Sequence, residues 1–313
     1  MLIKTSDEKA VRQFFKDIVL PERKSHKGEN GKVLIIGGSS LFHSASLWAA
    51  EIVSRFVDIV HYASTKENEE IFLKLKTKFR SGIVVLKKIL LEYVREDDLI
   101  LIGPGMVRDY EIKKKLRSLR EGQPDYKKFS KIISLKNEAA YSYFITKFLL
   151  ENFPEKKFVI DAGSLQMMNS HWLLKLKVKP ILTPHQKEFE ELFQFKISDL
   201  PFFEKEKLVK EIAKKYHSVI ILKAVNDVIS DGDKVFVVEG GNQGLTKGGT
   251  GDILAGLAAG FYTKNKPLIS AVCASILLKK TADVLFQEFG YWYNINDILV
   301  KIPQIFKKII FEK

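Results

Sequence analysis

The chain has 313 residues, 46% of them hydrophobic, so it can bury a large core. No apolar run has the length that a membrane-spanning helix needs, and the amino terminus lacks a hydrophobic signal core, so we expect a cytoplasmic protein without a membrane partner. A single cysteine, Cys273, excludes an internal disulfide. The net charge of +13 is spread over scattered lysines, which predicts a solvated surface and no specific nucleic-acid partner.

The amino-terminal part of the chain alternates helix-like and strand-like segments. Residues 1–25 are predicted to form a helical extension, with its helix over Asp7–Val19. The β-rich run Lys32–Ile36 ends in two glycines, which is typical of a buried parallel strand that opens into a ligand-binding loop. A helix over Ala45–Phe56 and a strand over Asp58–Ala63 are expected to follow.

The middle of the chain repeats this alternation. A strand over Asp98–Gly103 closes in the turn sequence GPG, and a charged, partly helical insertion is predicted at about 109–131. A strand over Lys131–Leu135, a helix over Glu138–Leu150 and a strand over Lys157–Asp161 come next. This order predicts a parallel sheet with helices on both faces.

The third part adds two strands and a hairpin. A short strand over Pro180–Thr183 leads into a helix that carries His185 and Glu188, which share one face of its first turn. A strand over Val219–Leu222 precedes a hairpin formed by residues 228–238. The whole pattern is that of an α/β fold with a mostly parallel central sheet, in which ligands bind at the carboxyl ends of the strands.

The sequence NQGLTKGGTGDILAGLAAG, residues 242–260, is the stretch around which the rest is organised. Its glycines remove side chains where a backbone must approach a ligand closely, and an apolar helix begins near Asp252. The unpaired N–H groups at the start of that helix could hold a phosphate or a developing anion. Asp252 has two interpretations: it is the N-cap of the helix, or it is a carboxylate that accepts a proton from an attacking hydroxyl.

Six segments between residues 26 and 260 carry a resemblance when they are taken in order. They are HKGENGKVLIIGGS, LIGPG, VIDAGSL, LTPHQKEFEEL, VIILKAVNDVI and the glycine-rich stretch just described. Together they resemble the ATP- or ADP-dependent NAD(P)H-hydrate dehydratases of the ribokinase-like superfamily. The resemblance implies a three-layer sandwich, with residues 26–313 forming one ribokinase-like catalytic domain.

The resemblance also implies a reaction and its partners. Such an enzyme, a lyase, restores NADH and NADPH from their hydrates: ATP or ADP phosphorylates the C6 hydroxyl of the hydrated ring, and phosphate then leaves. The implied partners are therefore NAD(P)H hydrate, ATP or ADP, and Mg²⁺. Relatives are often tetramers, so a homo-oligomer is expected.

Site residues follow by matching the motifs position by position. Asp252 matches the catalytic base, and the backbone of Gly249, Thr250 and Gly251 would hold the transferring phosphoryl group. The residues matched to the hydrate pocket are Ala45, Gly105, His185 and Asp252. Those matched to the nucleotide site are Lys223, Ala224, Val225, Asn226, Asp227 and Gly251. Glu188 matches a position from which an acidic side chain reaches Mg²⁺, here through water.

Several positions depart from the family pattern. Ala224 replaces a glycine and Asp227 a threonine beside the nucleotide, and Lys247 intrudes before GGTGD, where it could add a positive charge for phosphate. The remaining departures are Ser44, Val107 and Gly163. Two alternatives therefore stay open: another kinase of the superfamily that acts on a vitamin precursor, or a nucleotide-binding pseudoenzyme.

Overall fold

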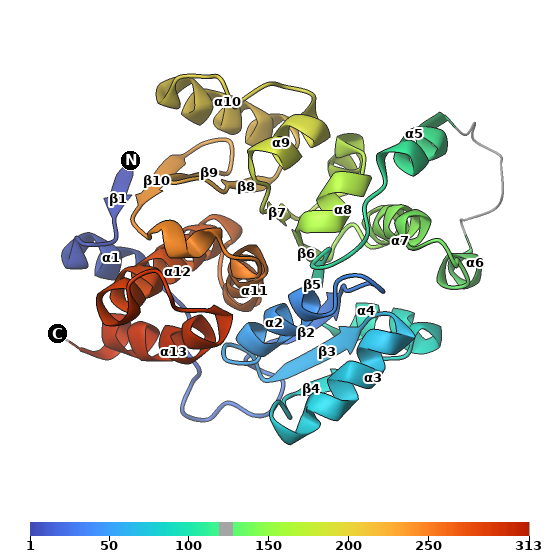
Figure 1. Ribbon diagram of the computed structural model, residues 1–313, viewed down its shortest axis with the longest axis horizontal. Helices are drawn as coiled ribbons and strands as arrows, with labels where there is room; N and C mark the ends of the chain where they lie inside the picture. Colours follow the sequence, from blue (N-terminus) through green and yellow to red (C-terminus); the bar gives the residue numbers. More distant parts are fainter. Residues whose placement is uncertain (119–127, 313) are drawn as a thin grey trace.

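A single ten-stranded sheet runs through the protein, as a computed structural model that describes residues 1–118 and 128–312 shows (Figure 1). The strands are β1 (Leu2–Lys4), β2 (Lys32–Ile36), β3 (Ile59–Ala63), β4 (Gly82–Val84), β5 (Leu99–Ile102), β6 (Lys157–Ile160), β7 (Ile181–Leu182), β8 (Val219–Leu222), β9 (Asp227–Ser230) and β10 (Val235–Glu239). Their order in the sheet is β1-β10-β9-β8-β7-β6-β5-β2-β3-β4.

Most neighbouring strands are parallel. Among the described strands, only β9 runs against its two neighbours, β8 and β10, and the β9–β10 pair is the predicted hairpin. The seven strands that are neighbours in the order β8-β7-β6-β5-β2-β3-β4 are parallel. Their carboxyl ends therefore lie along one edge of the sheet, where a ligand site is expected.

Helices cover both faces of the sheet. They are α1 (Glu8–Phe15), α2 (Ser44–Val53), α3 (Lys66–Lys74), α4 (Leu90–Glu96), α5 (Tyr110–Ser118), α6 (Phe129–Ile133), α7 (Glu138–Asn152), α8 (Ala162–Met167), α9 (Gln186–Phe193), α10 (Phe202–Lys215), α11 (Thr250–Tyr262), α12 (Pro267–Phe289) and α13 (Ile295–Phe311). In Figure 1, α7 to α10 lie on one side of the sheet and α11 to α13 on the other. The three layers and the mostly parallel sheet confirm the predicted fold class.

The alternation of side chains in β2 shows how each face is filled. Val33 and Ile35 point into the core beneath α2, α11 and α12, whereas Leu34 and Ile36 point into the core beneath α4, α7 and α9. All four side chains are almost completely buried. The unbroken apolar run from Val33 to Ile36 therefore marks a central parallel strand here, as the sequence predicted.

One predicted strand is wrong. Residues 131–135 belong partly to α6 and the turn after it, and they form no strand. The sheet has no place for them, because β5 pairs directly with β6. Ile132 and Leu135 belong instead to the core that includes α7, and α6 is held there by Phe129, whose ring lies 5.4 Å from that of Phe148.

The amino-terminal segment contributes more than a helix. The helix expected over Asp7–Val19 is present as α1, capped by Asp7, whose carboxylate accepts from the Ala10 N–H. Before it, β1 adds a parallel edge strand beside β10, which the sequence analysis missed. Within the charged insertion predicted at about 109–131, α5 and α6 are described, and residues 119–127 lie outside the described residues. Among the described helices, none combines the length and the apolar character needed to span a bilayer.

Candidate active site

The glycine turn before α11 takes a conformation that only glycine accepts readily. Gly249 is the N-cap of α11 with φ 104°, and a β-carbon there would lie 2.6 Å from the Trp48 ring. Asp252 is therefore not the N-cap, as one interpretation of the sequence had it. It is the third residue of α11, in the first turn, where its carboxylate stands beside the free N–H groups of the helix start.

Lys223 lies directly against this turn. Its position at the carboxyl end of β8 brings the ammonium group within 3.4 Å of where a β-carbon on Gly251 would stand. The same ammonium donates to Asp161 Oδ1 at 3.1 Å and lies 3.8 Å from Glu188 Oε2. Burial alone would lower the pKa of Lys223, but these two carboxylates outweigh it, and the pKa rises.

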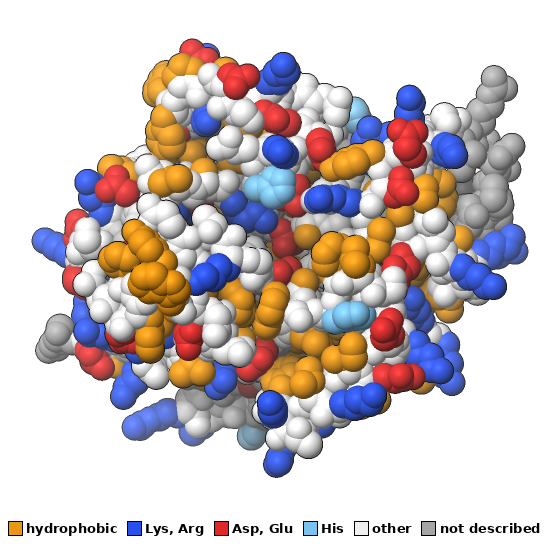
Figure 2. Space-filling view, viewed as in Figure 1, with side chains coloured by type: hydrophobic (Ala, Val, Ile, Leu, Met, Phe, Trp, Pro, Cys, Tyr) orange, Lys and Arg blue, Asp and Glu red, His pale blue; other side chains and the backbone are white. Residues whose placement is uncertain are grey.

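Asp252 faces the same group of charges. Burial raises its pKa from 3.8 to about 7, the negative charge of Asp161 adds to the rise, and Lys223 opposes it. A carboxyl group with a pKa near neutrality exchanges protons readily at physiological pH, which is the property of a general base. Acidic and basic side chains meet at the centre of the face shown in Figure 2, beside a histidine.

Glu188 and His185 form the start of α9. His185 Nδ1 accepts from the Glu188 N–H at 3.2 Å, and Glu188 Oε2 accepts from the His185 N–H at 2.9 Å, which is a capping box. Glu188 is 3% exposed and also accepts from Gln166 Nε2 at 2.7 Å. With Nδ1 engaged as an acceptor, the imidazole is left with Nε2 as the nitrogen that can donate.

Asp161 is a candidate site residue that the sequence analysis did not assign to the site. It follows β6 directly, it is 1% exposed, and its Oδ1 accepts from the Thr183 hydroxyl at 2.7 Å as well as from Lys223. The next residue, Ala162, has φ 41°, an unusual value for a residue with a β-carbon. An acidic residue at the carboxyl end of a central parallel strand was the available signal, together with its place at the start of DAGSL.

Ala45 and Gly105 lie together, on the side of the site formed by the loops after β2 and β5. Gly105 has φ +70°, and a β-carbon there would lie 3.1 Å from Ala45 Cβ and 3.2 Å from Gly38 Cα. The loop that contains Gly105 also packs against Asp161, because a β-carbon on Gly103 would lie 1.8 Å from the Asp161 carbonyl oxygen. The close contact at Gly103 and the left-handed φ at Gly105 favour glycine at both positions.

Gly163 departs from the family pattern for a similar reason. A β-carbon at this position would lie 2.2 Å from the Met106 carbonyl oxygen, so no acidic side chain fits there. Close packing between the loop after β5 and the start of α8 accounts for the glycine.

The turn from Lys223 to Asp227 is held from below. Asp227 Oδ1 accepts from the Ala224 N–H at 3.0 Å, and Oδ2 accepts from the Ser275 hydroxyl at 2.7 Å. Lys279 lies 3.6 Å from the same carboxylate and donates to the Val225 carbonyl at 2.6 Å. Asp227 is 5% exposed, so its carboxylate interacts with the turn and with α12 rather than with solvent.

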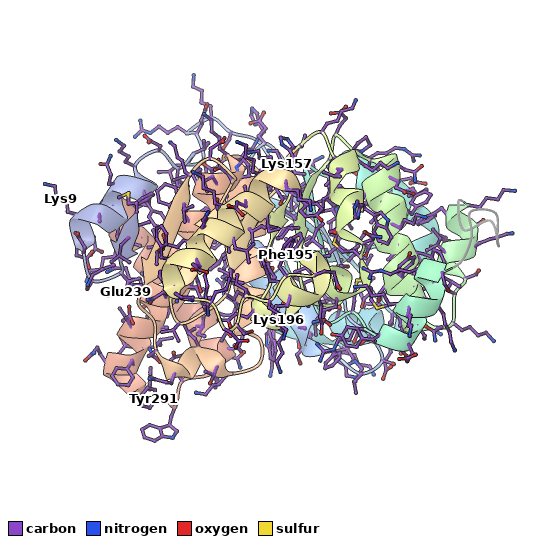
Figure 3. All side chains as sticks on the ribbon, turned by 90° about the horizontal axis from the view of Figure 1, so that it is seen from above. Lys9, Lys157, Phe195, Lys196, Glu239 and Tyr291 are labelled. Atoms are coloured by element: carbon purple, nitrogen blue, oxygen red, sulfur yellow. The ribbon has the colours of Figure 1, made fainter. Side chains whose placement is uncertain are left out.

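Val225 and Lys247 behave differently from the rest of the predicted site. Val225 is 88% exposed at the tip of its turn. Lys247 donates to the carbonyls of Tyr291 and Tyr293, so its ammonium fastens the loop between α12 and α13 to the glycine turn. Tyr291 is labelled on that loop in Figure 3. The suggestion that Lys247 provides a charge for phosphate is therefore not supported by its contacts.

The described residues contain no group of three or more His, Cys, Asp or Glu side chains that could hold a metal ion by themselves. The carboxylates of Glu188 and Asp161 both lie within 4.0 Å of the Lys223 ammonium. Each carboxylate has oxygen lone pairs that can accept hydrogen bonds from water. Because Mg²⁺ keeps several waters and is usually bound together with substrate phosphates, these two side chains fit an ion held mainly by a nucleotide and its waters.

Comparisons with known proteins point in one direction. The family model for NAD(P)H-hydrate dehydratase matches residues 33–304. An ADP-dependent (S)-NAD(P)H-hydrate dehydratase of Nitrosopumilus maritimus is 30% identical over 302 residues, which cover 92% of this chain and 93% of that protein. The bifunctional NAD(P)H-hydrate repair enzyme Nnr of Methanocaldococcus jannaschii is 30% identical over 290 residues, or 90% of this chain, and the chain spans only 49% of it.

Solved structures support the fold. A ribokinase-like superfamily protein of Enterococcus faecalis V583 has a TM-score of 0.75 at 22% identity and covers 100% of this chain and 97% of its own. The ADP/ATP-dependent NAD(P)H-hydrate dehydratase of Bacillus subtilis, co-crystallised with ATP/Mg²⁺, has a TM-score of 0.70 at 20% identity, over 96% of this chain and 97% of its own.

Proposed function

Because the chain belongs to the NAD(P)H-hydrate dehydratase family, whose model it matches over residues 33–304, we propose that it restores NADH and NADPH from their hydrates with ADP or ATP as the phosphoryl donor. In this reaction the terminal phosphoryl group passes to the C6 hydroxyl of the hydrated ring, and the hydroxyl proton goes to a base. Phosphate then leaves C6 as a proton leaves C5, which restores the ring double bond.

The observation that carries the proposal is the environment of Asp252. A carboxyl group with a pKa of about 7, in the first turn of a helix that follows a glycine turn, is suited to accept the hydroxyl proton while the oxygen attacks phosphorus. The backbone N–H groups of Gly249 and Gly251 would bind the equatorial oxygens of the phosphoryl group, and the Thr250 N–H, which donates to the Lys247 carbonyl at 3.4 Å, would share its hydrogen bond with them. Lys223, 3.4 Å from the β-carbon position of Gly251, would neutralise charge on the same group.

The two ligands are proposed to enter from opposite sides of Asp252. Lys223, Ala224 and the turn that Asp227 holds would bind the nucleotide, with Val225 and Asn226 at the outer rim of that side. Ala45, Gly105 and His185 would line the hydrate pocket. If Mg²⁺ accompanies the nucleotide, Glu188 and Asp161 would accept hydrogen bonds from its waters, and the ion would reduce the negative charge on the phosphates.

The test is an absorbance assay with purified protein, Mg²⁺, and either ATP or ADP. NADH hydrate should be converted to NADH in a nucleotide-dependent way, and comparing the two nucleotides would identify the donor. Phosphorylation of another small alcohol without hydrate turnover would favour the vitamin-precursor kinase instead. A protein that binds nucleotide but turns over neither would be a pseudoenzyme.

We favour the active enzyme over the pseudoenzyme alternative because of the contacts that Asp227 makes. That alternative rested on Ala224 and Asp227, and the Asp227 carboxylate is engaged with Ser275 and Lys279 within the turn. With alanine at position 224, the backbone N–H of that residue still donates to the Asp227 carboxylate, so the turn keeps its hydrogen bond. We also propose a cytoplasmic location. We further propose a homo-oligomer, a tetramer by resemblance, and light scattering of the purified protein would test the oligomeric state.

A further inference from the structure

A cavity lies beside the residues proposed for the hydrate pocket, at the carboxyl ends of β2 and β3. It has a volume of ≈ 210 Å³, and lysines from three separate segments line it together with one carboxylate: Lys66, Lys87, Lys136 and Glu138. Glu138 is already engaged, because its carboxylate accepts from the Ser40 N–H at 2.9 Å and from the Ser40 hydroxyl at 2.8 Å. Lys66 is paired as well, because its ammonium lies 3.8 Å from Glu70 Oε1 on the exposed face of α3. Among the described residues, Lys87 and Lys136 have no such carboxylate partner within 4.0 Å, so they supply the positive charge of the lining.

Lys87 is the central cation of this cavity. Its ammonium lies 4.2 Å from the centroid of the Tyr141 ring, which fixes it above the aromatic face. In the part of the chain that the structure describes, no carboxylate lies within 4.0 Å of it, and the negative charges that act on it are those of Glu69 and Glu138. Burial lowers the pKa of Lys87, so an anion that enters the cavity would restore the favourable charge balance.

The cavity shares a wall with the hydrate pocket. Gly38 and Met106 line it, and Gly38 is the residue whose Cα lies 3.2 Å from the β-carbon position of Gly105. Along the sheet edge, β3 lies three strand spacings from β6, or about 14 Å from the strand end that carries Asp161. The nucleotide loop after β8 lies on the opposite side of β6. An anion in this cavity would therefore belong to the hydrate and not to the phosphoryl donor.

We propose that this cavity binds a phosphate group of the dinucleotide substrate, through Lys87 with Lys136 and Lys66 at its rim. The inference rests on the proposed function, because the hydrate is the ligand that carries phosphates several bonds away from its reacting ring. Two of its groups share this chemistry: the pyrophosphate, present in both NADH hydrate and NADPH hydrate, and the 2′-phosphate, present only in the latter.

Calorimetric titration with NADH and NADPH, which carry the same phosphates as the hydrates, would test the subsite. Lys87→Met should weaken binding by ~10-fold or more, the effect of losing a charge-assisted hydrogen bond. Loss for both dinucleotides would assign the pyrophosphate to the cavity, and loss for NADPH alone would assign the 2′-phosphate. Lys88→Met, at the exposed neighbouring lysine, should bind both as the wild type does.

Two further variants keep the test independent of folding. Lys136→Met changes an exposed rim residue and should weaken binding by a few-fold, and Lys87→Arg should recover most of the affinity. If Lys87→Met and Lys136→Met both bind NADH and NADPH within twofold of the wild type, the subsite is wrong. Hydrate turnover by the wild type is scored separately: turnover with unchanged binding in these variants overturns the subsite alone, and Lys87-dependent binding without turnover overturns the proposed function alone.

Discussion

Replacing Asp252 by asparagine should make the protein more stable at neutral pH while it abolishes most activity. The folded-state pKa of about 7 exceeds the ordinary value of 3.8, so between these two pH values the folded protein holds a proton that the unfolded chain releases. Stability must therefore fall as pH rises through this window, and it must level off above pH 7. The asparagine amide does not titrate in this range, so the variant should show none of this decline.

The size of the effect follows from the same pKa. Between pH 5 and pH 8 the wild type titrates through its folded-state pKa of about 7, two units above the starting pH, which corresponds to at most about 3 kcal/mol at 1.36 kcal/mol per unit. Urea unfolding at both pH values would measure it as a widening gap between Asp252→Asn and the wild type. The exposed Asp199→Asn is the matched control and should run parallel to the wild type.

Activity provides the second half of this prediction. Loss of a general base typically costs 10²–10⁴-fold, so kcat should fall by ~10² or more in Asp252→Asn. In the wild type, kcat/KM should fall as pH drops below about 7, because protonation removes the base. Stability curves that stay parallel from pH 5 to pH 8 would refute the raised pKa, and normal turnover by the folded variant would refute the catalytic role.

The other predictions concern the surroundings of Asp252. Asp161→Asn should move the acid limb of the pH–rate profile to lower pH, because it removes a like charge; an unmoved limb would mean that burial alone raises the pKa. Gly105→Ala, strained by about 1–2 kcal/mol at φ +70° and pressed against Ala45, should raise KM for the hydrate and leave nucleotide affinity within twofold, as calorimetry would show. Asp227→Ala should lower the free energy of unfolding by about 3–5 kcal/mol by leaving the buried Lys279 without an opposite charge, and Asp227→Ala with Lys279→Met should recover much of it in urea unfolding.

Much of the fold could be predicted because the central strands carry unbroken apolar runs, and β2 and β5 are followed directly by glycine. β2 was predicted with its observed bounds, and the hairpin of β9 and β10 followed from the turn at Asp231–Asp233. The short edge strands β1 and β4 were missed, since three residues carry too little pattern to register. The strand predicted at residues 131–135 was wrong, because a short apolar run fits a strand or a buried helix equally well. Only the direct pairing of β5 with β6 excludes the strand.

Some features of the candidate site could be predicted from the sequence, and others could not. The glycine turn and Asp252 were predictable because their chemistry is local in the sequence. The contact of Lys223 with Asp161 joins residues 62 positions apart, and the bond from Gln166 to Glu188 joins residues 22 positions apart. Such contacts depend on the order of β6, β7 and β8 in the sheet, which no local pattern contains.

Asp227 and Asp252 show why position in a motif does not determine what a carboxylate does. Both belong to the segments that flank the proposed nucleotide site, and both are acidic residues that a sequence places near phosphate. Asp227 meets a hydroxyl, an N–H group and an ammonium, so its charge stabilises the fold. Burial and the like charge of Asp161 raise the pKa of Asp252 while Lys223 lowers it, so its negative charge costs stability and the carboxyl group gains and loses its proton near neutral pH. We therefore place the proton transfer of the proposed reaction at Asp252 and not at Asp227.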